Sequence, residues 1–301
     1  MSNWLPKSAA GKRWLGLAPT YFVIGVFMLV PVAIMAVFSF LEPNPYGGVK
    51  PVPSFDAYIK IFFEYDLEDQ LVFNPGYVNI ILRSFQLSIG ATILCLIFGF
   101  PVAYYITLQP EHKRNIYIYL ITIPFWTNLL IRTFAWIIIL GRGGVIETPL
   151  LATGIIEDSL RMMYTDGAIA IGLTYSYLPL MVLPIYASLE KLDFRLLEAA
   201  SDLYANRWQV MTKVVLPLCK PGIIAGCILV FIPSIGAFIA PNLLGGGKKL
   251  MLGSLVQFQF ASARNWPFGS ALSMLLLAAV VISLIFYAKS AKKRAAIEGG
   301  H

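Results

Sequence analysis

Long runs of apolar residues, rather than an alternation of apolar and polar positions, dominate this chain of 301 residues. A helix needs about 20 apolar residues to cross the hydrocarbon core of a bilayer. A strand of a membrane β-barrel would instead alternate over about ten positions, and these runs do not alternate. The pattern therefore predicts an all-α integral membrane protein, with one membrane domain over residues 1–301 and six transmembrane helices. The predicted spans are residues 15–40, 84–108, 116–140, 167–189, 222–240 and 268–288.

The composition agrees with a chain that lies mostly in lipid. Hydrophobic residues make up 58% of it, charged residues only 13%, and the mean hydropathy is +0.73. So few polar residues could not cover the surface of a soluble domain of this size. We interpret the net charge of +7 as a consequence of membrane topology and expect no nucleic-acid partner.

The Lys and Arg residues are distributed unevenly between the segments that join the spans. With both termini in the cytoplasm, 14 of the 23 lie on the inner side and eight on the outer side, although the outer segments are longer. Inner segments near span ends normally carry the excess of positive charge, so we expect both termini in the cytoplasm. The first span follows Lys12 and Arg13 as in a signal peptide. It is about twice the usual length and lacks a clear cleavage site, so we expect it to stay as an anchor.

Two outer segments have patterns of their own. Residues 42–83 contain five prolines and an acidic run from Glu64 to Asp69, which is typical of a structured surface segment with turns. This segment is either a solvated face or a docking surface for a periplasmic partner. Residues 148–163 mix apolar and charged positions and are too short for a span, so we expect an amphipathic helix at the outer interface.

Ionisable side chains inside a bilayer are expensive, and by default they mark functional positions. All Asp and Glu residues fall outside the predicted spans, which argues against a transporter driven by protons or sodium. Among the basic residues, only Arg132 lies inside a span. Its side chain either reaches the outer edge or carbonyl groups of a neighbouring helix, or it lines a hydrated path.

The sequence contains no arrangement typical of catalysis or of energy supply. Its two histidines, His112 and His301, are too far apart for a metal site, and no combination of Ser, His and acid is visible in the membrane. Residues 245–249, GGGKK, lack parts of a phosphate-binding loop and lie on the outer side. We therefore expect no catalytic residue, no metal ligand and no bound cofactor. If this chain moves a solute uphill, another subunit must supply the energy.

The inner segment 190–220 is polar and charged although it lies between two apolar spans. Residues 196–203 can form a short helix with Ala199 and Ala200 on its apolar face, where small side chains let a partner approach closely. From this pattern alone, the segment is either a solvated loop or a docking site.

Glu198, Ala199 and Ala200, followed at a distance by Leu216 and Pro217, resemble the cytoplasmic EAA loop of permease subunits in bacterial ABC importers. In that family the loop forms a coupling helix that sits in a cleft of the ATPase subunit and transmits its closure to the membrane helices. The resemblance implies the type I importer permease (MetI-like) fold, and it implies that these five residues couple the chain to the ATPase.

Tyr204 belongs to the same coupling loop but departs from the family pattern, which usually has Gly at this place. If that residue turns the chain with a positive φ angle, a tyrosine costs about 1 kcal/mol there. The resemblance therefore predicts a coupling role for Tyr204 and leaves the conformation of the turn open.

Four further segments narrow the resemblance to the spermidine and putrescine branch of these permeases. They are PFWTNLLIRTFAWIIILG at 124–141, YSYLPLMVLPIYASLEKLD at 175–193, and PNLLGG with NWPFGSALS at 241–246 and 265–273. Polyamine permeases often carry acidic residues where this sequence has Ala237, Asn242 and Asn265, and fewer carboxylates attract a di- or tricationic solute less strongly. Either the binding protein supplies the cation recognition, or the solute is an opine, an amino-acid derivative or a phosphonate.

The resemblance also implies partners and a mechanism. A periplasmic solute-binding protein would deliver the solute, and this chain would form the path with a second permease subunit, surrounded by lipid of the bacterial inner membrane. A dimer of ATP-binding cassette ATPase subunits would use ATP and Mg to switch access. The second permease subunit is either a different chain or a copy of this one. An ion-coupled secondary transporter and a membrane enzyme are the alternatives from other classes.

Six residues are our candidates for the path, although the sequence does not show which way they face. The aromatic ones among them can attract a cation to their ring faces, whereas packing is the ordinary role of such residues. The candidates are Trp126, Asn128, Arg132, Tyr177, Ser234 and Phe238.

Overall fold

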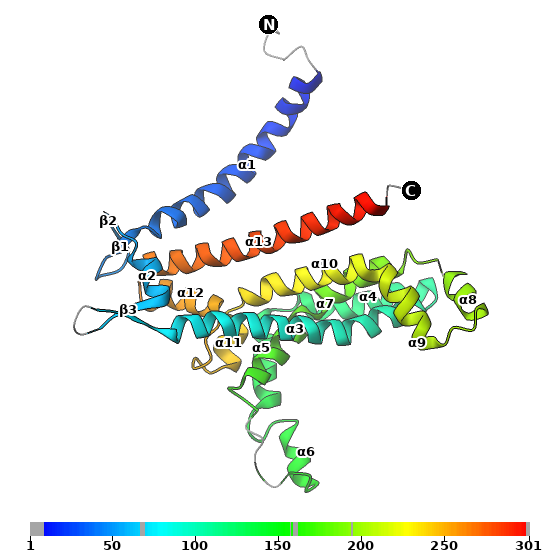
Figure 1. Cartoon of the computed structure of the whole chain (residues 1–301). Helices are drawn as coiled ribbons and strands as arrows, with labels where there is room; N and C mark the ends of the chain where they lie inside the picture. The colour runs from blue at the N-terminus through cyan, green and yellow to red at the C-terminus, as the bar shows by residue number, and fades with distance from the viewer. Residues whose placement is uncertain (1–8, 67–69, 157, 159–161, 194, 299–301) are drawn as a thin grey trace. The chain divides into compact units, whose positions relative to one another are not determined.

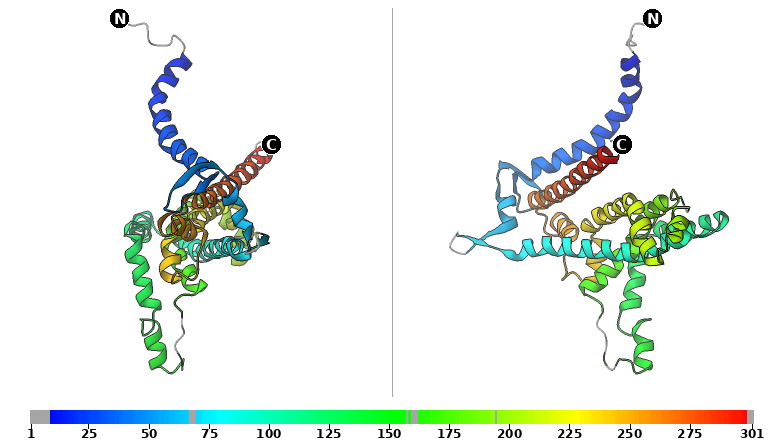
Figure 2. Two further views of the ribbon diagram at one scale, coloured as in Figure 1. Left: turned by 90° about the vertical axis from the view of Figure 1, so that its left-hand side faces the viewer. Right: turned by 45° about the vertical axis from the view of Figure 1, so that its right-hand side comes forward.

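The computed structural model of this protein is mostly helical and describes residues 9–66, 70–156, 158, 162–193 and 195–298 (Figure 1). Contacts within the chain divide it into two compact units. The first unit consists of Met1–Pro75 and Val256–His301, and the second of Gly76–Leu255. Each unit is described by itself below, and Figure 2 gives two further views.

The first unit combines long helices with two small β-hairpins. Its strands pair antiparallel, β1 with β2 and β3 with β4. The predicted structured outer segment thus consists of two hairpins with a short helix between them, although its residues 67–69 lie outside the described part. The elements are α1 (Ala9–Phe38), β1 (Leu41–Pro43), β2 (Val49–Pro53), α2 (Asp56–Phe62), β3 (Phe63–Tyr65), β4 (Leu71–Phe73), α12 (Leu252–Ala261), which begins in the second unit, and α13 (Trp266–Glu298).

Aromatic packing fixes the hairpins to the helices of this unit. The ring of Phe40 contacts the rings of Phe55 and Tyr58, and the Tyr58 hydroxyl donates a hydrogen bond of 2.9 Å to Ser39 Oγ. Ile61 of α2 and Phe268 of α13 are buried, and α2 packs against α13. This outer segment is therefore a folded structure with its own core.

The second unit holds most of the membrane helices. In Figure 1, α3, α7 and α10 run roughly side by side, whereas α5 turns away from their common direction. The elements are α3 (Pro75–Thr107), α4 (Glu111–Trp126), α5 (Leu129–Leu140), α6 (Glu147–Ala152), α7 (Asp166–Leu189), α8 (Arg195–Asp202), α9 (Arg207–Val210), a π-helical turn η1 (Met211–Val215), α10 (Leu216–Ile235) and α11 (Ile239–Leu244).

Five helices in the described residues are long and apolar enough to cross a membrane, and a sixth span results if α4 and α5 count together. The predicted third span differs from a single helix, because α4 and α5 are bent by 91° at a short break. The break follows Pro124, which lies in the last turn of α4, and the side chain of Asn128 caps the new helix α5. The predicted interface helix over 148–163 is limited to α6, and residues 157 and 159–161 of it lie outside the described part.

Close contact between α7 and α10 holds the core of the second unit. Met181 of α7 is fully buried, and a side chain at Gly226 of α10 would collide with its Sδ atom at 2.7 Å. A Cβ atom at Gly222 would lie 2.5 Å from the backbone oxygen of Pro184. Small residues allow membrane helices to approach this closely, where packing replaces the hydrophobic effect as the force between helices.

This packing predicts that Gly222→Ala lowers the free energy of unfolding in detergent by about 1–3 kcal/mol, because the backbone of α7 must move to admit the methyl group. Gly90→Ala on α3 is the matched control, since no atom lies within 4 Å of its added Cβ. The control should be neutral or slightly stabilising, because Ala favours helix more than Gly. Equal effects of the two substitutions would contradict the packing argument.

Candidate functional site: two helix breaks and an exposed loop

The first break lies between α4 and α5. Thr127 and Asn128 have extended backbone conformations, and Asn128 Oδ1 accepts a hydrogen bond of 2.8 Å from the backbone N–H of Leu130, which caps α5. Both residues are exposed. Non-helical backbone at membrane depth is tolerated only where protein buries it or where it lines a water-filled cavity. The break therefore does not face lipid tails.

The second break lies between α10 and α11. α10 ends at Ile235, and the N–H of Ala237 bonds to the carbonyl oxygen of Ser234 at 3.2 Å. The short helix α11 follows at Ile239 and packs against both α5 and α7. The same unit thus carries two interrupted helices, and α11 of one packs against α5 of the other.

Three predicted path residues gather where α5, α7 and α10 meet. The Tyr177 hydroxyl of α7 donates a hydrogen bond of 3.2 Å to the carbonyl oxygen of Pro233, in the last turn of α10. The charge of Arg132 on α5 acts electrostatically on Tyr177. Ser234, next to Pro233, is fully buried and donates to Val230 O of its own helix at 2.5 Å.

The other three predicted path residues lie at the ends of the interrupted helices. Trp126, the last residue of α4, is 85% exposed, and Asn128 is the N-cap of α5. Phe238, the N-cap of α11, is 44% exposed. All six candidates therefore lie at or beside the two breaks, but Ser234 has its hydroxyl engaged and does not offer it to a solute.

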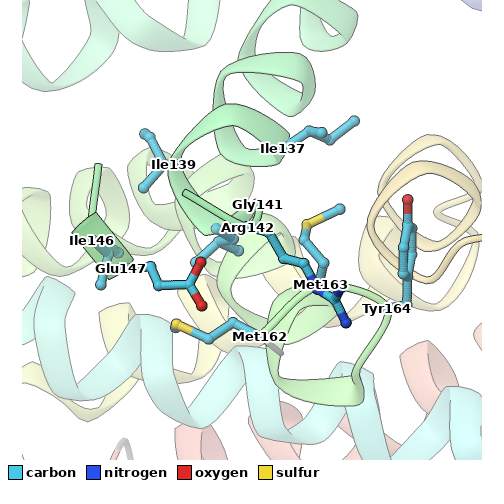
Figure 3. A pocket seen from close by; sticks show the side chains of 10 residues that line it. Ile137, Ile139, Gly141, Arg142, Ile146, Glu147, Met162, Met163 and Tyr164 are labelled. Atoms are coloured by element: carbon cyan, nitrogen blue, oxygen red, sulfur yellow. The ribbon is translucent and has the colours of Figure 1, made fainter. Parts of the chain in front are cut away.

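A cavity of about 450 Å³ lies at the far end of α5, and sequence reasoning missed it. Figure 3 shows Glu147, Met162, Met163 and Tyr164 among the side chains that line it. Glu147 is 5% exposed, and its Oε2 accepts a hydrogen bond of 2.6 Å from the backbone N–H of Gly143. In the sequence Glu147 is one of several acidic residues between predicted spans, and only the folded chain shows that it closes the turn after α5.

The inner loop forms the predicted short helix. α8 covers Arg195–Asp202, with Glu198 in its first turn, and Glu198 and Ala199 are both exposed. Leu197 packs against the buried core, whereas Leu203 is 81% exposed. The helix is thus attached by one side and presents the side with Glu198 and Ala199 to the surroundings.

Tyr204 has a positive φ angle of 58°, which decides the question that the resemblance left open. The N–H of Ala205 bonds to Ala200 O at 3.1 Å and the N–H of Tyr204 to Ser201 O at 3.0 Å. These two bonds form a Schellman motif, which places its left-handed residue immediately after the helix and normally uses glycine there. The Tyr204 side chain is 98% exposed, so packing within the chain does not compensate for the strain.

After this turn the chain enters the membrane without interruption. Asn206 and Gln209 form a capping box, with reciprocal bonds of 2.8 and 2.9 Å. A continuous run of helix then extends over Arg207–Ile235 through a π-helical turn. Leu216 opens α10 directly after the π-helical turn, and Pro217 follows it with no N–H to donate to the continuous helix. One helix therefore connects the loop with the second break.

Comparisons with known proteins place this chain in a family. A family model described as "Binding-protein-dependent transport system inner membrane component" matches residues 113–294. The spermidine/putrescine transport system permease protein PotB of Escherichia coli (strain K12) is 37% identical over 267 residues, which cover 89% of this chain and 93% of that protein. PotB of Haemophilus influenzae is 43% identical over 221 residues, 73% of this chain and 77% of the relative.

A solved structure agrees with the fold. The crystal structure of a bacterial ABC transporter that imports the acidic polysaccharide alginate contains a chain with a TM-score of 0.66 and 15% sequence identity, covering 93% of this chain and 95% of that one. The chain belongs to the family of inner-membrane components of binding-protein-dependent transport systems. The predicted all-α permease fold is confirmed, and the protein is a multi-pass protein of the inner membrane.

The strained turn predicts that Tyr204→Gly raises the free energy of unfolding by up to about 1 kcal/mol, because glycine adopts positive φ without a steric cost. Tyr119→Gly is the matched control, since Tyr119 is also exposed but lies inside α4. The control should be destabilised, because glycine disfavours helix. Chemical unfolding in detergent measures both, and a destabilised Tyr204→Gly would contradict the assignment of strain.

Proposed function

We propose that this chain is a permease subunit of an ATP-driven ABC importer that moves a polyamine such as spermidine or putrescine. The observation that carries the proposal is 37% identity, over nearly the whole chain, to permeases named for spermidine and putrescine transport. The two helix breaks suit a solute path, because non-helical backbone at membrane depth is tolerated where it lines a water-filled cavity.

The chain is a non-catalytic subunit in this proposal. A dimer of separate ATPase subunits hydrolyses ATP with Mg, and a periplasmic solute-binding protein delivers the solute to a path shared with a second permease subunit. The inner-membrane family supports this assembly, because its members are components of binding-protein-dependent systems. Both termini lie in the cytoplasm, as the distribution of Lys and Arg indicates.

We assign coupling to the ATPase to Glu198, Ala199 and Ala200 on α8. The same role is assigned to three residues that follow α8 in the chain, Tyr204, Leu216 and Pro217. The exposed side of α8 fits a docking surface, and Leu197 anchors the helix to the membrane core. When the ATPase subunits close, movement of α8 would reach the second break through α10, because a helix transmits displacement along its axis. This is how ATP hydrolysis outside the membrane would change access inside it.

Recognition of a polyamine requires groups that attract ammonium cations. The exposed rings of Trp126 and Phe238 at the breaks offer such groups, because aromatic faces attract cations. Ala237 lies in the second break itself, so this chain supplies no carboxylate at that position. We therefore assign most of the cation selectivity to the binding protein and to the second permease subunit.

The first experiment reconstitutes this chain with its neighbouring transporter subunits in proteoliposomes and measures ATPase activity that depends on the binding protein. Spermidine or putrescine should stimulate ATP hydrolysis several-fold, as expected for coupled import. Stimulation by an opine, an amino-acid derivative or a phosphonate alone would keep the importer and change its solute. Uptake that continues without ATP but needs an ion gradient would overturn the importer in favour of a secondary transporter.

The coupling assignment predicts that Glu198→Lys leaves the protein in the membrane but lowers transport and ATPase binding about tenfold or more, since a truncated or reversed charge at an interface commonly costs a few kcal/mol. Glu111→Lys is the matched control, because Glu111 is also exposed and also lies in the first turn of a helix, α4. Normal uptake by the Glu198 variant, or equal loss in the control, would refute the assignment.

A further inference from the structure

Arg132 has a buried charge without a partner in the described chain. It lies on α5, one turn after the first helix break. Its Nε and Nη1 atoms are both buried, and neither has a hydrogen-bond acceptor among the residues that the structure describes. The residue as a whole is half-buried.

The neighbours of Arg132 do not neutralise its charge. Tyr177 is close enough for an electrostatic interaction, but its hydroxyl hydrogen is directed to Pro233 O. The two ion pairs found among the described residues both use Asp166, which binds Arg83 at 3.2 Å and Lys249 at 3.5 Å. An unpaired charge inside the membrane region costs several kcal/mol, so an anion outside this set is expected.

The possible sources of that anion differ in the charges that they carry. On the proposed function the solute is a cation, which Arg132 repels. A second copy of this chain has no carboxylate within its spans beyond the first residue, because Glu111 opens α4 and Asp166 opens α7. A different chain is therefore the better source.

We propose that Arg132 forms an ion pair with a carboxylate of a second permease subunit that differs in sequence from this chain. The proposal rests on the proposed function, which supplies the second subunit. The surface around Arg132 suits such an interface, because Ile131 is 68% exposed and Phe134 is 51% exposed on the same helix. Apolar side chains around a charged pair exclude water, and the complementary charges make the interface specific for one partner.

The test uses the assembled importer, purified through a tag on this chain, with the affinity for the second permease subunit and the transport rate as readouts. Arg132→Gln should weaken association about 30-fold or more, which is the loss expected when one member of a buried charge pair is removed. Arg132→Lys keeps the charge and should retain most of the association. Arg142→Gln, an exposed arginine after the end of α5, is the matched control and should have no effect.

Charge reversal then identifies the partner group. Arg132→Glu is combined in turn with Asp→Arg or Glu→Arg at each acidic position in the spans of the second subunit, and one combination should restore assembly and transport. Wild-type behaviour of Arg132→Gln, or failure of every combination, would overturn the proposal. Restoration by a reversal within this chain would overturn the assignment to a different subunit. If the wild-type chain assembles with no ATPase, the proposed function fails before any variant is compared.

Discussion

Lipid tails offer no hydrogen-bond partner, so the backbone N–H and C=O groups of this chain must find partners in protein or water. This requirement governs the structure. In a bilayer, an N–H or C=O group without a partner costs several kcal/mol, so helices are the default and each interruption needs shelter. The breaks at Thr127–Asn128 and at Gly236–Phe238 are therefore informative, since their backbone must face protein or water. The Asn128 cap and the Tyr177 hydroxyl each satisfy one backbone group at these breaks.

The helix that includes α10 connects the second break to the loop that carries α8. It begins at Arg207, after the loop that carries α8, and it ends at the second break. Its close packing on α7 through Gly222 and Gly226 leaves little room for the two helices to slide independently. A displacement of the loop should thus move α7 and α10 together, which suits a subunit whose energy arrives from outside the membrane.

Two positions to which we assign functions are also positions that break local rules. Tyr204 holds a left-handed backbone conformation with an exposed ring, and Arg132 holds a charge in a membrane helix. Neither feature improves the stability of the isolated chain. Such exceptions are expected at sites where another molecule completes the structure, and both lie on surfaces that our proposals assign to partners.

The sequence was sufficient to predict most of the spans, the loop at 190–220 and its short helix, because hydrophobic run length and local helix signals depend on neighbouring residues. The predicted fifth span, residues 222–240, is instead interrupted at Gly236–Phe238. The resemblance marked Tyr204 as a departure from a usual glycine but left its conformation open, and the structure shows the positive φ angle. The 91° bend between α4 and α5, the burial of Glu147 and the unpaired state of Arg132 could not be predicted in this way. Each depends on contacts between segments far apart in the chain, such as α5 with α11, and a linear pattern does not encode which side chains such contacts bury.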